Sequence, residues 1–213
     1  MRVARRRLLL ATLSAAALAA CGRKPKLAAV PAGSTVLALG DSITFGVGAT
    51  PETSYPAVLA KLTGWQIVNA GISGDTSAGA LARLAGLLQE HSPRLVLVSI
   101  GGNDFLRRMP LDQTRDNVRR ICQLAAAGGA QVLLVAIPAF SAVAAVTGSL
   151  NDHAMFEELG NELKVPVHAK GWAAVLSDPA LRADPIHANE RGYALFAQGL
   201  VKTVQDIGFF QPQ

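Results

Sequence analysis

A serine lies directly after an apolar run near the start of the main body of the chain, in the triplet Gly40-Asp41-Ser42. The run before it, Val36-Leu37-Ala38-Leu39, has the composition of a strand that is covered on both faces. A serine at this point is presented at a strand-to-helix turn, where the first amides of the next helix face a developing anion. Ser42 is therefore a candidate nucleophile. Glycine, aspartate and serine are also common turn residues, so the triplet alone favours neither a catalytic nor a structural role.

A general base for such a serine must come from the four histidines. His187 closes the segment Asp184-Pro185-Ile186-His187, where a carboxylate three residues away can bond the second ring nitrogen and set the tautomer. Pro185 stiffens this turn. The other three are poorer candidates, because they end a predicted helix, begin one, or close a predicted strand without a nearby aspartate; they are His91, His153 and His168. A single Asp-x-x-His pair is nevertheless more often a surface turn than part of a triad.

Two further loops carry hydrogen-bond donors after apolar runs. The first is Asn69-Ala70-Gly71-Ile72-Ser73-Gly74-Asp75-Thr76, whose glycines let the backbone approach a substrate and point amide hydrogens into a site. Asp75 or Ser77 is expected to cap the helix that follows. The second loop, Gly101-Gly102-Asn103-Asp104, offers the neutral side-chain amide of Asn103, which suits an oxyanion that forms only in the transition state. The alternative for this loop is a pair of Asx turns.

The segments that must position these residues alternate between short apolar runs and helical periodicity. The predicted strands are 35–39, 66–69, 95–100, 131–137 and 165–168. The predicted helices are 55–63, 77–91, 111–127, 152–163 and about 189–207. This repeated alternation predicts an α/β fold with a five-stranded parallel sheet and helices on both faces. Ligands bind at the carboxyl ends of the strands in such sheets, so the candidate residues should follow the apolar runs.

The first 20 residues have the pattern of an export signal. Four arginines precede an apolar stretch from Leu8 to Ala20, which is shorter than the roughly 20 residues that span a bilayer. The stretch ends in Leu18-Ala19-Ala20-Cys21, which resembles the bacterial lipobox and implies that Cys21 is lipidated. An ordinary signal-peptidase cut with an incidental Cys21 is the alternative. We expect residues 21–33 to be a tether and residues 34–213 a folded domain, anchored to the cell envelope at the outer membrane and facing the periplasm.

The net charge of +5 is concentrated near the amino terminus. Seven of the 20 basic residues lie within the first 26 positions, which leaves 13 basic against 15 acidic residues, a net charge of −2, in the rest. A near-neutral body lacks the basic surface that binds phosphate backbones, so nucleic-acid binding is not expected. Cys122 lies among apolar neighbours in a helical pattern and is expected to be a small buried hydrophobe.

Taken together and in chain order, the four segments closely resemble those of the SGNH (GDSL-type) hydrolases. The resemblance runs from about Val36 to about Ala197 and is closest to the bacterial thioesterase, arylesterase and lysophospholipase branch, which shares the runs S-G-D-T-S and G-G-N-D. It implies a flavodoxin-like, three-layer fold with no metal and no cofactor. It also implies these roles: Ser42 as nucleophile, His187 as base, Asp184 as its orienting acid, and an oxyanion hole formed by the Ser42 amide, the Gly74 amide and the Asn103 side chain.

One segment departs from that branch. Pro138–Leu150 is small and apolar, where the branch typically carries a polar stretch with arginine and tyrosine. This segment is expected to border the acyl pocket, so the resemblance leaves the preferred chain length open. Phe105, Leu106 and Phe140 are candidate walls of that pocket. Ordinary core positions are the alternative for all three.

The resemblance favours an esterase that acts on small-molecule acyl esters or lysophospholipids. Because an exported protein does not meet cytoplasmic acyl-CoA, thioester cleavage would be a chemical capability rather than the biological task. A carbohydrate or peptidoglycan O-acetylesterase is the enzymatic alternative, although only 5% of residues are aromatic and could stack on sugars. A catalytically inactive lipoprotein that uses the fold only for binding is a third reading. The presence of all five functional positions argues against it.

Overall fold

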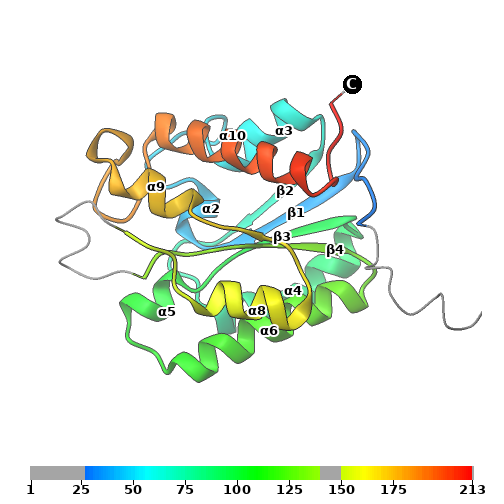
Figure 1. Cartoon of the computed structure of the whole chain (residues 1–213), viewed down its shortest axis with the longest axis horizontal. Coiled ribbons are helices and arrows are strands. Elements are labelled where there is room, and N and C mark those ends of the chain that lie inside the picture. Colours follow the sequence, from blue (N-terminus) through cyan, green and yellow to red (C-terminus); the bar gives the residue numbers. More distant parts are fainter. Residues whose placement is uncertain (1–26, 140–149, 213) are drawn as a thin grey trace, which may run out of the picture.

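The computed structural model describes residues 27–139 and 150–212. Its centre is one parallel sheet in the order β2-β1-β3-β4-β5 (Figure 1). The strands are β1 (Thr35–Gly40), β2 (Gln66–Gly71), β3 (Leu95–Ser99), β4 (Gln131–Val135) and β5 (Val167–His168). This strand order is that of flavodoxin-like folds. The predicted α/β fold with a five-stranded parallel sheet is confirmed.

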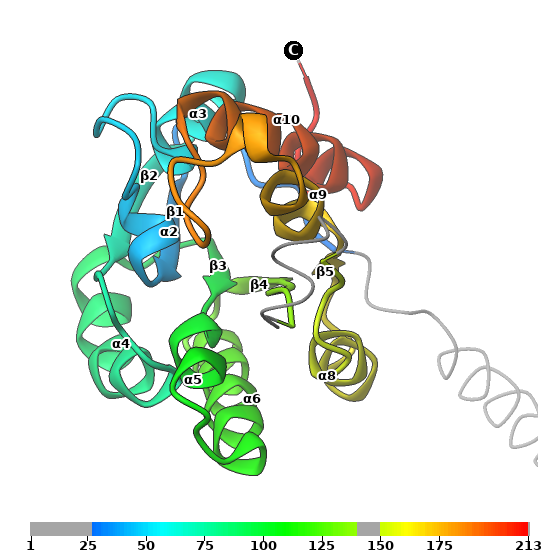
Figure 2. The ribbon, with the colours of Figure 1, turned by 90° about the vertical axis from the view of Figure 1, so that its left-hand side faces the viewer.

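Helices cover both faces of the sheet and make it the middle of three layers. One face carries α3 (Tyr55–Thr63), α9 (Gly171–Ser177) and α10 (Glu190–Asp206), and the other carries α4 (Ser77–His91), α6 (Leu111–Ala127) and α8 (Met155–Leu163) (Figures 1 and 2). Shorter turns of helix follow β1 and β3, namely α2 (Ser42–Phe45) and α5 (Gly102–Leu106), and a 3₁₀ turn, η2 (Pro179–Leu181), precedes α10. Within the described ranges, no helix is both long and apolar enough to cross a bilayer.

The two central strands are apolar because both of their faces are covered. Every residue of β3 is buried, as is every residue of β1 after Thr35. On the α10 face an aromatic cluster fills the core, with the rings of Trp172 and Phe196 stacked 3.5 Å apart and Tyr55 packed edge-on against both. On the other face Cys122 is 1% exposed, which confirms it as a buried apolar residue.

The helix boundaries follow local signals where those signals are strong. The predicted bounds of α3, α4 and α6 agree with the structure, and Gly64 ends α3 with φ of 70° in the left-handed region. Asn189 caps α10, as expected, because its side chain accepts a hydrogen bond from the Gly192 amide.

The prediction was wrong around the end of β4. That strand ends at Val135 rather than at Ile137, and α8 begins at Met155 rather than at Asp152. The reason is an antiparallel bridge between Pro138 and Asp152, which holds both chain segments extended. Helix α9 was not predicted from the sequence.

Candidate active site

Ser42 lies at the amino end of α2, directly after β1, at the carboxyl edge of the sheet. The turn is tight, because a Cβ on Gly40 would lie 2.0 Å from the Thr44 hydroxyl and 2.6 Å from the Ser99 carbonyl oxygen. Only glycine fits there. Asp41 is the N-cap, and its side chain accepts a 3.0 Å hydrogen bond from the Ile43 amide. The sequence therefore folds the strand end into a turn that presents the serine at the edge of the sheet.

A hydrogen-bonded chain joins Ser42 to the segment before α10. The His187 Nε2 atom lies 2.9 Å from the Ser42 Oγ atom, and His187 Nδ1 lies 2.7 Å from Asp184 Oδ2. The second carboxylate oxygen, Oδ1, accepts 2.8 Å hydrogen bonds from the amides of Ile186 and His187. Burial raises the pKa of Asp184, but these bonds from the ring and the two amides outweigh it and hold the pKa below its ordinary value. The acid is thus ionised and fixed beside the ring.

The other three histidines do not reach Ser42. His168 is buried beneath α10, where its Nδ1 lies 2.7 Å from the Thr203 hydroxyl, and burial lowers its pKa to about 4. His153 stacks on Phe105, and its pKa is also lowered by burial. His91 ends α4 beside Glu90. His187 is the histidine that geometry pairs with the candidate nucleophile.

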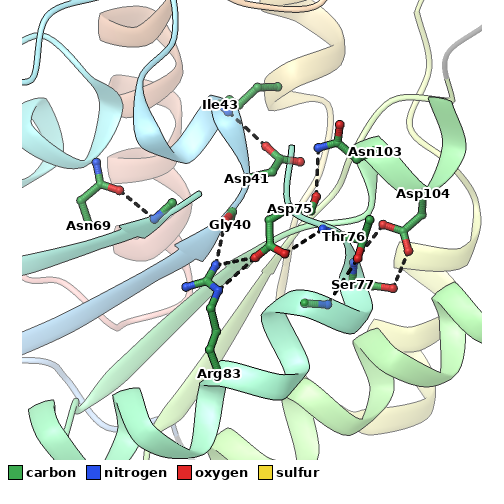
Figure 3. A network of polar contacts seen from close by, with 12 residues as sticks. Gly40, Asp41, Ile43, Asn69, Asp75, Thr76, Ser77, Arg83, Asn103 and Asp104 are labelled. Carbon is green, nitrogen blue, oxygen red and sulfur yellow. Dashed lines mark hydrogen bonds and ion pairs between the residues drawn. The ribbon is translucent and has the colours of Figure 1, made fainter. Parts of the chain in front are cut away.

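Gly74 lies in the loop after β2, and Asn103 lies in the short helix α5 that follows β3. Gly74 has φ of +78° in a turn closed by the Asp75 amide, which donates 3.0 Å to the Ile72 carbonyl. The Asn103 side-chain nitrogen donates 2.9 Å to the backbone carbonyl of Asp75 (Figure 3). A side-chain amide carries two N–H donors, so the nitrogen that bonds Asp75 has a second N–H for which a substrate oxygen is a suitable acceptor. Two of the three predicted oxyanion donors, Gly74 and Asn103, therefore lie on segments that this hydrogen bond joins.

The expected helix cap was wrong. Thr76 caps α4 by accepting a hydrogen bond from the Gly79 amide. The Asp75 carboxylate instead pairs with Arg83, with Nε at 3.0 Å and Nη2 at 2.9 Å from Oδ2. The Ser77 amide and hydroxyl both donate to the buried carboxylate of Asp104 (Figure 3). Both side chains serve contacts between segments, and nothing in the local sequence signals those contacts.

Asp41 is a buried acid beside the nucleophile, and it was not among the predicted site residues. Its exposed fraction is 4%. Burial raises the pKa of its carboxyl to about 6, although the Ile43 amide and the neighbouring His187 act in the opposite direction. Its adjacency to Ser42 was visible in the sequence, whereas its burial depends on the packing of the whole edge.

The proposed pocket walls differ in their surroundings. Phe105 is partly buried, stacks 4.6 Å from the His153 ring and lies edge-on to Phe156. Leu106 is 44% exposed at the end of α5. Phe140 lies outside the described residues, as does Cys21. Within the described residues, no group of three or more histidine, cysteine, aspartate or glutamate side chains could hold a metal ion.

A flavodoxin-like fold with a hydroxyl–imidazole–carboxylate chain at the carboxyl edge of its sheet has the arrangement of a serine hydrolase. The chain belongs to the GDSL-like lipase/acylhydrolase family, which matches residues 38–195. It is 36% identical over 192 residues to Thioesterase 1/protease 1/lysophospholipase L1 of Escherichia coli strain K12, a match that covers 83% of this chain and 86% of that protein.

Two further comparisons agree with this family. The chain is 45% identical over 111 residues to Esterase TesA of Pseudomonas aeruginosa, covering 50% of this chain and 55% of that protein. The crystal structure of TesA matches with a TM-score of 0.71 and 31% identity, and the match covers 81% of this chain and 99% of that chain. The family resemblance and the fold expected from the sequence are confirmed.

Proposed function

We propose that this protein hydrolyses carboxylic esters of acyl groups, with Ser42 as nucleophile, His187 as general base and Asp184 as the acid that orients the ring. The observation that carries this proposal is the continuous chain of contacts, 2.9 Å from Ser42 to His187 and 2.7 Å from His187 to Asp184. These distances lie within the range at which a base takes a proton from a hydroxyl.

The geometry supports a two-stage acyl transfer. Nε2 of His187 takes the Ser42 proton as Oγ attacks the acyl carbon, and the carbonyl oxygen of the ester becomes an oxyanion. The Ser42 and Gly74 amides and the Asn103 side chain donate to that oxygen. The imidazolium then protonates the leaving alcohol or thiol, and an acyl-serine remains. His187 next deprotonates a water molecule, which attacks the acyl-serine, and the returning proton restores Ser42 as the acid leaves.

The edge that carries the triad also presents apolar side chains. Phe45, Ile72 and Leu106 follow β1, β2 and β3, and they are 57%, 49% and 44% exposed. Exposed apolar side chains that follow these strands suit the hydrocarbon part of an acyl ester or lysophospholipid. The names of the relatives, which include thioesterase, lysophospholipase and esterase, support acyl esters and lysophospholipids as the substrate class. They also support thioester cleavage as a chemical capability of the site.

The deciding experiment measures hydrolysis of nitrophenyl esters from acetate to dodecanoate by the wild type and by Ser42→Ala. We expect the wild type to turn over and the variant to be inactive. Labelling by a fluorescent phosphonate should occur in the wild type alone. Hydrolysis of every ester at the same rate by both proteins would exclude the proposed triad. A preference for acetate that falls steeply with chain length would favour an O-acetylesterase instead, and binding without hydrolysis would favour the non-catalytic alternative.

We also propose that the protein is exported and held in the cell envelope by lipid on Cys21. The support is the basic, then apolar leader that ends in L-A-A-C. Lipid on a residue only a few positions before the described start of the domain would keep the enzyme close to the membrane surface.

A further inference from the structure

The proposed oxyanion donors come from three separate strand ends, and an ion pair between Arg83 of α4 and Asp75 of the loop after β2 links these ends. The Arg83 guanidinium donates 3.0 Å from Nη2 to the Gly40 carbonyl, the last residue of β1. It also donates to the carboxylate of Asp75. The backbone carbonyl of Asp75 in turn accepts a hydrogen bond from the Asn103 side-chain amide (Figure 3). A chain of direct bonds therefore runs from the turn before Ser42, through Arg83 and Asp75, to the Asn103 side chain.

The position of Arg83 in α4 explains how it reaches these partners. Helical side chains point toward the amino end of their helix, and Arg83 lies in the second turn of α4, so it reaches back to the loop that precedes the helix. Gly79 lies beside this contact, where an added Cβ would lie 2.0 Å from Asp75 Oδ1. The side chains of Arg83 and Asp75 are only 21% and 11% exposed, so solvent screens this pair less than a surface ion pair.

The same pair balances charge near the site. Asp75 and Asp104 both act to raise the pKa of Asp41, so three carboxyls lie close enough to interact beneath the oxyanion donors. An unpaired carboxylate there would oppose an oxyanion. Asp104 receives hydrogen bonds from Ser77 and Thr114, and Asp75 receives the guanidinium. An arginine stays protonated at every working pH, so this compensation is constant.

We propose that Arg83 is a positioning residue, which, through Asp75, aligns the oxyanion hole of the proposed esterase. It touches neither Ser42 nor His187. Its bond to the Gly40 carbonyl anchors the guanidinium, and its effect reaches the substrate through Asp75 and Asn103. The inference rests on the proposed function. The expected cost of losing it is bounded by the loss of a whole oxyanion donor, which is roughly 10²–10³ in rate. Partial misalignment should cost roughly 10- to 100-fold in kcat with little change in KM.

The test compares Arg83→Gln with a matched control, Arg119→Gln. Arg119 is also a partly exposed arginine, 25% exposed, and its 2.6 Å ion pair with Glu162 joins α6 to α8 and involves no residue of the proposed site. We expect kcat to fall roughly 10- to 100-fold for Arg83→Gln alone, with KM for a nitrophenyl ester within about twofold of the wild type. Arg83→Lys should recover part of the lost kcat. A lysine keeps the positive charge, but its single ammonium group cannot reproduce the two-nitrogen geometry of the guanidinium.

A double variant separates positioning from general damage. In an Asn103→Ala background, Arg83→Gln should cost about threefold or less, because the group that it aligns is absent. Asp75→Asn, which keeps an oxygen for the Thr76 amide but removes the charge, provides a second route if Arg83→Gln does not fold. A kcat within twofold of the wild type for folded Arg83→Gln, or for folded Asp75→Asn, would overturn the inference. The inference would also be overturned if Arg83→Gln lowered kcat by the same factor in the Asn103→Ala background as in the wild type. An inactive wild type would instead reject the proposed function.

Discussion

Replacing Asp184 by asparagine should invert the hydrogen bonding of His187, the proposed general base. The two carboxylate oxygens of Asp184 have different tasks, since Oδ1 accepts from the Ile186 and His187 amides and Oδ2 faces the ring Nδ1. An asparagine side chain has only one oxygen, and that oxygen accepts the hydrogen bonds from the Ile186 and His187 amides. Its NH₂ group then faces Nδ1, which must act as an acceptor. The ring proton moves to Nε2, where it faces Ser42, and the base is lost.

The magnitude follows from the number of contacts that fix this orientation. Two 2.8 Å hydrogen bonds from backbone amides oppose rotation of the side chain at position 184. The His187 tautomer with its proton on Nε2 should therefore dominate at neutral pH. A change of this kind costs about 10⁴ in kcat for a comparable triad, or about 5.5 kcal/mol. Asp184→Ala leaves both tautomers accessible, so it should be more active than Asp184→Asn at pH 7 even though it is the less stable protein.

The assay is kcat/KM for a nitrophenyl ester at pH 7, together with ¹⁵N chemical shifts of the His187 ring. We expect the Asp184→Asn ring to carry its proton on Nε2. Activity within tenfold of the wild type for Asp184→Asn, or a proton that stays on Nδ1, would refute the reasoning about the two oxygens.

Three further predictions follow from the site, the core and the leader. Asn103→Ala should lower kcat roughly 10²–10³-fold with little loss of stability, measured by steady-state kinetics and urea unfolding; an unchanged kcat would remove Asn103 from the oxyanion hole. His168 has its pKa lowered from 6.5 to about 4, so the unfolded chain binds the proton more readily and stability is lost as the pH falls through that window. The wild type should therefore lose about 2–3 kcal/mol relative to His168→Asn between pH 7 and pH 4.5, and a constant difference in unfolding free energy would contradict this. Cys21→Ser should abolish labelling by a palmitate analogue, whereas equal labelling of both proteins would disprove lipidation.

Much of the fold could be predicted because its signals are local. Amphipathic segments predicted the bounds of α3, α4 and α6 correctly, with a glycine directly after α3 and after α6, and continuous apolar runs located the strands. The short helix α9, Gly171–Ser177, has only seven residues and no side-chain N-cap bond, so periodicity could not identify it. The bridge between Pro138 and Asp152 joins positions separated by the segment that also departs from the family pattern, and no local rule predicts it.

The candidate site was predictable to the same extent, and for the same reason. Because functional groups in a parallel sheet gather after the strands, the ends of the apolar runs led to Ser42, Gly74 and Asn103. The Asp-x-x-His spacing led to the base segment. What remained hidden was the partner of each polar residue. Arg83 lies within an amphipathic helical pattern, which predicts that a charged residue is exposed to solvent. Asp75 precedes a helix, where the pattern predicts that an aspartate is the N-cap.

The sheet register shows why such hidden contacts are necessary. Gly40 pairs with Gly71 on one side and with Ser99 on the other, so all three strands end at one level. The candidate groups lie beyond that level, on loops and short helices that the strand hydrogen bonds no longer hold. The Asn103 amide on Asp75 and the Arg83 guanidinium on Gly40 supply direct bonds between these loops where the strand pairing has ended. Strand pairing thus brings the candidate groups to one edge of the sheet. Side-chain hydrogen bonds from α4 and α5 then fix the positions of these groups relative to one another, which a preorganised oxyanion hole requires.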